Sequence, residues 1–161
     1  MSVVECAQCS ATTRQGERCR IRTCKYAHMC WQHTKTLLHL GIKPSNIPNA
    51  GSGLFTYIDI PPKTIICKYE GTTIDRADYN NSGYAVDIPK GRVIDGSSTQ
   101  SSIGRYANNC RPSDKAHCKC NNAKFAISTR AGITTINIKS TKFIKAGSEI
   151  FVAYGRGYWK R

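Results

Sequence analysis

Cysteine and histidine residues near the N-terminus have the spacing of metal ligands. In chain order they are Cys6, Cys9, Cys19, Cys24, Cys30 and His33. A gap of two residues lets two ligand atoms face one ion from a tight turn, and such gaps separate Cys6 from Cys9 and Cys30 from His33. Zinc takes four ligands of these types in a tetrahedron. The segment therefore predicts a zinc site, whose ion would stabilise a fold with few apolar side chains of its own.

The candidates outnumber the four ligands that one zinc ion takes. The preferred set is Cys9, Cys19, Cys30 and His33, which resembles a short C-x9-C-x10-C-x2-H element. Cys6 and Cys24 are additional or alternative ligands, and free thiols or disulfides are the bland interpretation of all of them. A weaker prediction is a second zinc site in a later loop, formed by Cys110, His117, Cys118 and Cys120.

The charge of the chain predicts an anionic partner. Lysine and arginine total 24 against 10 acidic residues, a net charge of +14 over 161 residues. Such a field attracts nucleic acid, nucleosomes or acidic protein surfaces. The basic residues interleaved with the first cysteines would contact phosphate, or would form a solvated face: Arg14, Arg18, Arg20, Arg22 and Lys25.

Two features of the sequence bear on location. No stretch reaches the ~18 apolar residues that would span a bilayer, and the N-terminus lacks the apolar core of a signal peptide. We therefore expect an intracellular protein with no membrane contact. In a reducing compartment, the nine cysteines favour metal binding over disulfides.

Further along the chain, short motifs follow one another in a fixed order. They are Gly51-Ser52-Gly53-Leu54, Tyr69-Glu70-Gly71, Tyr84-Ala85-Val86-Asp87, Arg105-Tyr106-Ala107-Asn108-Asn109-Cys110 and Gly147-Ser148-Glu149-Ile150-Phe151-Val152-Ala153-Tyr154-Gly155. One G-x-G is weak evidence, but the series resembles the signatures of the SET domain of protein lysine methyltransferases over about residues 42 to 159. Small stand-alone SET proteins of large DNA viruses are similar in style.

The resemblance implies a fold, a cofactor and a set of site residues. The fold is mainly β, with the Asn108 and Tyr154 segments threaded together in a C-terminal pseudoknot. The methyl donor is S-adenosylmethionine, bound by Gly51, Ser52, Gly53, Leu54, Arg105, Tyr106, Asn108, Asn109, Tyr154 and Trp159. Catalysis is assigned to Tyr154, with Tyr84 and Tyr69. The channel for the target lysine is lined by Tyr84, Val152, Tyr158 and Trp159.

Elementary chemistry suits these assignments. Gly51 and Gly53 allow positive φ and a close approach of the backbone to a ligand. The amide of Asn108 offers both a donor and an acceptor. A free lysine has a pKa near ~10.4, so its amine must lose a proton before it attacks a methyl group. The hydroxyl of Tyr154 would then stabilise charge and direct the amine lone pair.

The sequence also departs from the SET pattern. Asn109 stands where the family has histidine, and Ala153 replaces an acidic residue. Residues 111–121 form an insertion, and the cysteine-rich tail of the family is absent. The channel would be closed by Tyr158 and Trp159, by the Cys118 loop or by a partner chain. The resulting prediction is a lysine methyltransferase that acts on a histone or another basic-tailed protein, in nucleosomes and in the nucleus. The alternative is a catalytically weak zinc protein that binds chromatin or nucleic acid. A homodimer is a further expected partner state.

The elements that must position these residues are mainly strands. Short β-branched and aromatic runs alternate with Gly, Pro, Asn and Asp. The predicted strands are 54–58, 64–69, 84–88, 92–94, 125–129, 134–139 and 149–153, and a short helix is predicted over 31–40, closed by Gly41. We expect a zinc-binding element over residues 1–41 and the methyltransferase domain over 42–161.

Overall fold

The chain divides into two compact units, each built from two segments. The computed structural model describes residues 2–154. Unit 1 comprises Met1–His39 and Tyr69–Arg105, and unit 2 comprises Leu40–Lys68 and Tyr106–Arg161. The predicted channel residues Tyr158 and Trp159 lie outside the described residues. The expected boundary at residue 41 stays a prediction, since a compact unit is not the same thing as an evolutionary domain.

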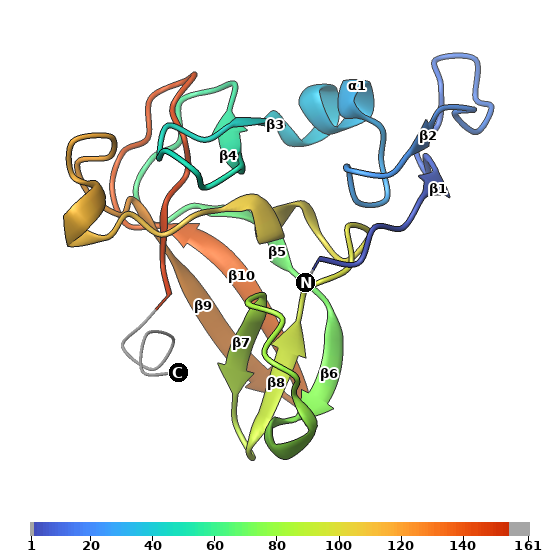
Figure 1. Cartoon of the computed structure of the whole chain (residues 1–161). Coiled ribbons are helices and arrows are strands. Elements are labelled where there is room, and N and C mark those ends of the chain that lie inside the picture. Colours follow the sequence, from blue (N-terminus) through green and yellow to red (C-terminus); the bar gives the residue numbers. More distant parts are fainter. Residues whose placement is uncertain (1, 155–161) are drawn as a thin grey trace. The chain divides into compact units, whose positions relative to one another are not determined.

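Unit 1 combines the cysteine-rich segment with a three-stranded sheet of order β6-β8-β7. All pairings in this sheet are antiparallel. Its elements are β1 (Ala7–Gln8), β2 (Arg22–Thr23), α1 (Trp31–His33), the π-helix η1 (Thr34–Leu38), β6 (Thr72–Asp75), η2 (Arg76–Asp78), β7 (Ala85–Ile88) and β8 (Arg92–Asp95), as labelled in Figure 1. The 3-10 helix η3 (Ile103–Tyr106) continues the chain into unit 2.

Unit 2 contains a four-stranded sheet of order β11-β9-β10-β5 and the separate pair β3-β4. Its elements are β3 (Leu40–Pro44), β4 (Ser52–Thr56), β5 (Ile65–Tyr69, whose last residue belongs to unit 1), η4 (Pro112–Asp114), β9 (Ala123–Arg130), β10 (Ile133–Ser140) and β11 (Val152–Ala153). The mainly β fold class predicted from the sequence is confirmed.

The longest pairing is the β9-β10 hairpin, in which Ile133 faces Arg130 and Ser140 faces Ala123. Its two-residue turn places both Ala131 (φ 48°) and Gly132 (φ 77°) in the left-handed region. Two consecutive positive φ values match the right-handed twist of the flanking strands. The hairpin is visible in Figure 1 as two long neighbouring arrows.

Strand alternation builds the core of unit 2. In β10, Ile136 and Ile138 are buried and separated by the partly exposed Asn137. This is the period of two that the sequence predicts for a half-buried strand. Leu54, Ile144 and Ile150 are buried with them. This core supports the strands that carry the predicted cofactor-binding motifs.

The observed elements differ from the predicted ones at two kinds of place. The helical segment ends at His39, which has φ 55°, and not at Leu40 with Gly41 after it. Gly41 instead lies in β3, where any side chain would collide with the ring of Tyr57. The strands β1, β2, β3 and β6 are additional to those predicted. Each has only two to five residues, too few for a periodic pattern.

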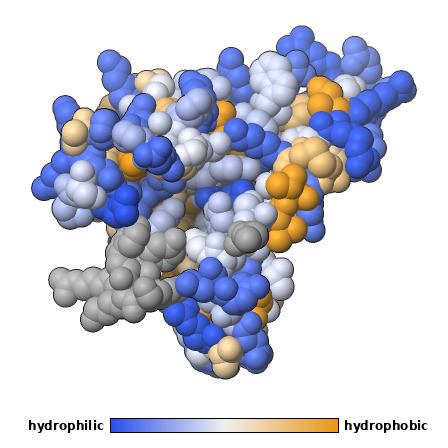
Figure 2. Space-filling view, viewed as in Figure 1, coloured by the Kyte–Doolittle hydropathy of each residue, from blue (hydrophilic) through white to orange (hydrophobic). Residues whose placement is uncertain are grey.

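The surface of the protein is mainly hydrophilic. Figure 2 shows polar residues over most of the viewed face, with apolar residues in small separate patches. Among the described residues, no helix is both long enough and apolar enough to cross a membrane.

Candidate functional site

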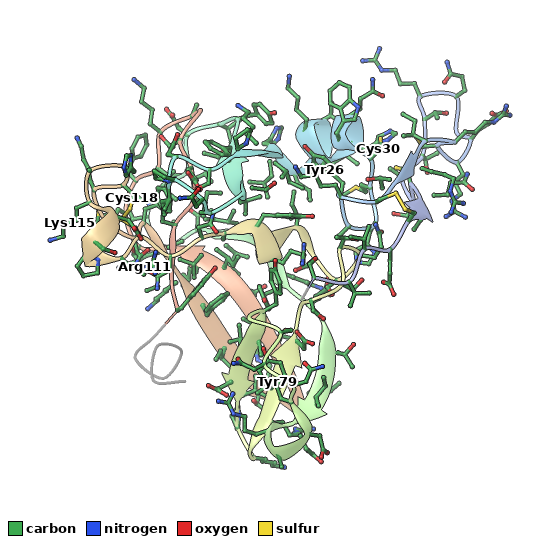
Figure 3. The ribbon with its side chains drawn as sticks, in the orientation of Figure 1. Tyr26, Cys30, Tyr79, Arg111, Lys115 and Cys118 are labelled. Atoms are coloured by element: carbon green, nitrogen blue, oxygen red, sulfur yellow. A yellow bond between two sulfur atoms is a disulfide. The ribbon has the colours of Figure 1, made fainter. Side chains whose placement is uncertain are left out.

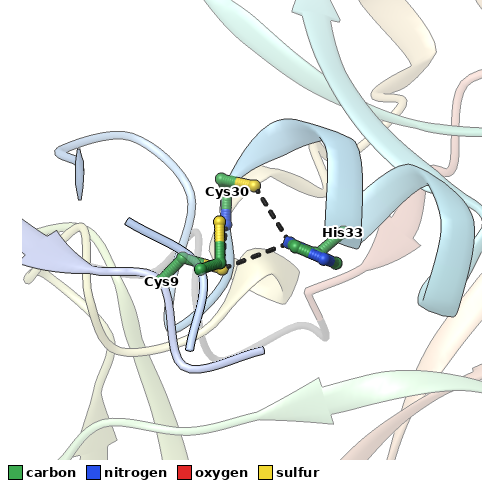
Figure 4. A group of neighbouring side chains, drawn as sticks. Cys9, Cys30 and His33 are labelled. Carbon is green, nitrogen blue, oxygen red and sulfur yellow. Dashed lines mark hydrogen bonds between the residues drawn. The ribbon is translucent and has the colours of Figure 1, made fainter. Parts of the chain in front are cut away.

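The ligand atoms of Cys9, Cys19, Cys30 and His33 converge on one point in unit 1. All four lie within 4.8 Å of one another. The Nδ1 atom of His33 lies 3.3 Å from the Cys30 sulfur and 3.5 Å from the Cys9 sulfur, as drawn in Figure 4. A tetrahedral zinc ion, with Zn–S bonds of ~2.3 Å and Zn–N bonds of ~2.0 Å, fits between a nitrogen and sulfurs at such separations. The structure thus brings together the preferred ligand set.

Local structure explains the convergence. Cys30 is extended and directly precedes α1, so Cys30 and His33 stand three residues apart on one helical face. Cys9 follows β1, and its amide donates to the carbonyl of Ile21 beyond the turn. Cys19 donates its amide to the carbonyl of Ala11. The turn between Ala11 and Cys19 therefore brings Cys19 back beside Cys9.

The electrostatics of the cluster favour a cation. Burial raises the pKa of the Cys9 thiol, but hydrogen bonds from the amides of Cys30 and Ala11 outweigh it and lower the pKa to about 7. Burial raises the pKa of Cys30, and the neighbouring Cys9 sulfur adds to that rise. A second thiolate is therefore disfavoured beside the first, and a divalent ion would remove that penalty. With their burial and donor set, these residues fit zinc.

Cys6 and Cys24 are excluded from the ligand set because they form a disulfide. The antiparallel pairing of β1 with β2 sets Ala7 opposite Thr23, so the next pair outward is Cys6 and Cys24. Their Cα atoms lie 4.0 Å apart. The alternative of extra zinc ligands at these positions is wrong for this structure, and they cross-link the strands instead.

The weaker second zinc site is also replaced by a disulfide, here between Cys110 and Cys118. Cys118 lies in the 111–121 loop with Arg111 and Lys115 (Figure 3). Cys120 is exposed, and its sulfur lies 2.9 Å from Lys142 Nζ. A lysine ammonium beside the sulfur makes this a poor place for a second cation. The only Cys/His cluster with metal-ligand geometry in residues 2–154 is the one around Cys9.

In unit 2, the Gly51–Leu54 segment meets Asn108. Gly51 has φ 71° and open space where a side chain would project, so the backbone there is accessible to a ligand. Asn108 Nδ2 donates to the carbonyl of Ser52 at 3.0 Å. Leu54 is fully buried and anchors β4. Two predicted cofactor-binding motifs, distant in sequence, are thereby held together.

A buried carboxylate that the sequence interpretation gave no role organises this junction. Glu149 is 2% exposed. It accepts hydrogen bonds at 2.7 Å from Ser45 Oγ and from the Asn46 amide, and at 3.2 Å from Asn108 Nδ2. A side chain at residue 53 would overlap with this carboxylate, which explains why glycine is needed there.

The C-terminal motif is threaded between two earlier segments of unit 2. On one side, Val152 donates its amide to the carbonyl of Asn108 at 2.8 Å. On the other, β11 pairs in parallel with β9, with Val152 opposite Ala123. Asn122 holds the C-terminal motif in place, because its side chain accepts from the Phe151 amide and donates to the Glu149 carbonyl. This arrangement matches the pseudoknot that the resemblance implies.

Tyr154 follows directly after β11. Its hydroxyl donates to the carbonyl of Ala107 at 2.7 Å, and its ring stacks on Phe125 with centroids 6.1 Å apart. Because the hydroxyl donates its hydrogen to a backbone carbonyl, the lone pairs of its oxygen can accept hydrogen bonds from other groups. The residue is half-buried, so a ligand can reach the ring.

The other predicted residues of unit 2 have different surroundings. The side-chain oxygen of Asn109 accepts a hydrogen bond from the side-chain NH2 group of Asn121. The side-chain oxygen of Asn121 in turn accepts from the Cys110 amide. Tyr106 ends η3 and is half-buried. Val152 is fully buried in β11, so its place in a lysine channel stays a prediction.

Three further predicted residues lie together in unit 1. Tyr69 is buried, and its hydroxyl donates to the carbonyl of Tyr84. The guanidinium of Arg105 lies 4.3 Å from the ring centroid of Tyr84 and donates to the carbonyls of Gly96 and Ser97. These contacts brace the unit. The roles of Tyr69 and Tyr84 in catalysis and of Arg105 in cofactor binding stay predictions.

The unit 2 residues fit the methionine part of S-adenosylmethionine. Asn108 uses its side-chain NH2 group inside the protein, and among the described residues none donates to its side-chain oxygen Oδ1, which would accept from an ammonium group. The open backbone at Gly51 and the glycine at 53 would let the ligand lie against the chain. Asn108, Gly51 and Ser52 would hold the cofactor at this place.

Comparison with known proteins agrees with this reading of the geometry. No curated protein matches the chain. The family model of the SET domain, whose members are typically S-adenosylmethionine-dependent lysine methyltransferases, matches residues 51–155. This range is well over half of the chain and includes Gly51, Asn108, Glu149 and Tyr154. The chain belongs to the SET domain family.

Proposed function

We propose that the protein is an S-adenosylmethionine-dependent protein-lysine N-methyltransferase. The observation that carries the proposal is the assembly, within unit 2, of Gly53 and Asn108 around the buried Glu149 carboxylate, with Tyr154 bonded to the carbonyl of Ala107, the residue before Asn108. Family membership supports the reaction class. The proposal assigns this chain's residues to binding, alignment and charge stabilisation.

When bound, the cofactor supplies an electrophilic methyl group on a sulfonium. The chain must then present a neutral lysine amine in line with it. Tyr154 is suited to this because its hydroxyl proton is directed to Ala107 and its oxygen can accept an N–H from the amine. Accepting that bond turns the nitrogen lone pair away from Tyr154 and stabilises the cationic product. Alignment of the two reactants supplies much of the rate.

The proposed substrate is a basic segment, in the first instance a histone tail in a nucleosome. A chain with net charge +14 repels such a tail unless carboxylates receive it locally. Unit 1 has a hollow of about 380 Å³ whose lining includes the carboxylates of Glu5 and Glu70 with Ser98 and Gln100. Two of the ten acidic residues of the chain therefore line this hollow. This hollow is the proposed contact for lysine and arginine side chains of the substrate, and a histone target would place the protein in the nucleus.

The test uses the zinc-loaded full chain with radiolabelled cofactor and recombinant nucleosomes. Tyr154→Phe is expected to lower the transfer rate by about 10²–10³-fold, with cofactor affinity by calorimetry changed little. Tyr79→Phe is the matched control, because its hydroxyl also bonds within the protein, to Ser82 and Gly83. It should leave the rate unchanged.

Two results would contradict the proposal. One is the same rate in Tyr154→Phe and the wild type. The other is an absence of cofactor binding in a folded, zinc-loaded sample, which would favour a chromatin-binding protein with an inactive SET core. Transfer to free histones but not to nucleosomes would keep the reaction and change the substrate.

A further inference from the structure

A hollow of about 520 Å³ lies beside the metal centre in unit 1. The proposed reaction does not use it. Its lining includes the metal ligands Cys19 and His33, and three arginines: Arg14, Arg18 and Arg20. The turn that forms its edge is held by two backbone hydrogen bonds between residues 13 and 16–17. The zinc fold thus presents a shaped surface with concentrated charge.

The hollow is strongly cationic. Its lining contains three arginines and a single acidic residue, Glu17. The Arg20–Glu17 ion pair has an N–O distance of 3.6 Å, with the two side chains 89% and 69% exposed. A pair with this exposure contributes little and leaves most donors of Arg20 to other partners. Arg22 and Lys25 extend the positive charge along the chain.

Arg18 differs from its neighbours because it is anchored. Its Nε donates to the Cys9 carbonyl at 3.1 Å and its terminal nitrogen to the Gln8 carbonyl at 3.3 Å. An ordered arginine loses less conformational entropy when it binds an anion. Arg14 and Arg20 are exposed on either side of it in sequence. The metal ligands fix this arrangement, because Cys9 and Cys19 hold the two arms of the turn.

The lining also restricts the kind of anion. Single-stranded nucleic acids bind proteins largely through bases stacked on aromatic side chains. Among the described residues that line this hollow there is no Phe, Tyr or Trp, and the one imidazole, that of His33, belongs to the metal centre. Guanidinium groups with amide side chains such as Gln15 and Gln32 suit phosphate oxygens instead. The chemistry favours the phosphodiester backbone of a duplex over exposed bases.

We infer that the hollow formed by Arg14, Arg18 and Arg20 beside the metal centre binds the backbone of duplex DNA. The contact is independent of sequence, because it is made to phosphates. The inference deepens the proposed function, since a nucleosome would offer DNA to this hollow and a basic tail to the site. Its test involves neither cofactor nor methyl transfer, so the two proposals can fail separately.

The experiment is fluorescence anisotropy of a labelled 20-base-pair duplex titrated with the zinc-loaded full chain between about 50 and 200 mM NaCl. The Arg14→Gln/Arg20→Gln variant is expected to bind at least about 10-fold more weakly than the wild type. The slope of log affinity against log salt should fall by about two, one for each lost phosphate contact. Arg18 is kept in this variant because it also holds the fold.

The matched control is Arg130→Gln/Lys145→Gln, which removes two exposed charges from unit 2. It should retain most of the affinity and the salt slope. Zinc content and circular dichroism verify that both variants are folded. Tyr154→Phe should bind DNA like the wild type, whatever happens to methyl transfer.

Three outcomes would overturn the inference. Equal losses in the two double variants would mean that only net charge matters. Absence of binding at 50 mM salt would remove the site. Tighter binding of single-stranded RNA, or of an acidic peptide of equal charge, than of duplex DNA would assign the hollow to another partner.

Discussion

Burial of the Glu149 carboxylate costs free energy, and hydrogen-bond donors from separate segments of the chain offset this cost. The carboxylate accepts from Ser45, Asn46 and Asn108, which are about a hundred and about forty residues away in the chain. Hydrogen bonds to an ionised group are stronger than neutral ones, while a buried donor left without a partner is costly. This one residue therefore fixes the distance between the Gly51–Gly53 segment and Asn108.

Replacing Glu149 with glutamine tests this role. The amide puts an NH2 group where at least one donor now points, so we expect a loss of about 2–3 kcal/mol in the free energy of unfolding. Cofactor affinity should fall about 10-fold because Asn108 loses a fixed partner. Urea denaturation and calorimetry measure the two effects.

Glu17→Gln is the control for this change, since that carboxylate is exposed. Its unfolding free energy should stay within about 0.5 kcal/mol of the wild type. If Glu149→Gln were equally harmless, the carboxylate would have no organising role.

At the level of single residues, short local motifs predicted the ligand set of Cys9, Cys19, Cys30 and His33, and the structure brings these four together. The glycines at 51 and 53, Asn108 and Tyr154 carry similar local signals, and their roles stay predictions. Glu149 was visible within the C-terminal motif, but its partners at 45, 46 and 108 depend on tertiary structure. Disulfides were ranked below zinc binding because spacing alone does not distinguish thiolates that bind a metal from thiols that pair.

At the level of elements, the β9-β10 hairpin contains a strained position. Ala131 adopts a left-handed conformation, with φ 48°, which costs an alanine roughly 1–2 kcal/mol. Asparagine tolerates this conformation, and Asn-Gly is the preferred pair for such a turn.

Ala131→Asn is therefore expected to stabilise the protein by about 0.5–1 kcal/mol. Thermal denaturation should show a rise in Tm of roughly 1–4 °C. Ala126→Asn, in the middle of β9, should not stabilise. A fall in Tm for Ala131→Asn would mean that this turn does not limit stability.

Strands with a long alternating pattern of apolar and polar residues were predicted well from the sequence. Strands that form only because a neighbouring strand pairs with them were predicted poorly. The alternation in residues 134–139 is sufficient to predict β10. By contrast, the local sequence of β3 contains Gly41, Lys43 and Pro44, and only its pairing with β4 makes it a strand. The helix end at His39 depends on the same pairing, since the chain must turn before Leu40 begins β3.

At the level of the whole molecule, the metal centre is expected to hold part of unit 1 together. The buried residues of its cluster are the ligands Cys9, Cys19 and Cys30, with Ala11 and Met29 packed on them. So small an apolar cluster provides little hydrophobic stabilisation.

Removing zinc with a chelator should therefore unfold residues 9–33 locally. Hydrogen exchange is expected to accelerate by about 10-fold or more there, while β9 and β10 keep their protection. Mass spectrometry under native conditions should count one zinc ion per chain. Two ions, or unchanged exchange after chelation, would contradict this account of the metal centre.

The threading of β11 has a consequence for synthesis. The ribosome releases Gly51–Gly53 and Asn108 before residues 149–154 emerge. Glu149 and Val152, which both bond to Asn108, lie in that later segment, and so does Tyr154. A nascent chain therefore remains without the carboxylate that joins the two motifs and without the tyrosine. The junction between the two motifs can therefore close only after translation has passed this segment.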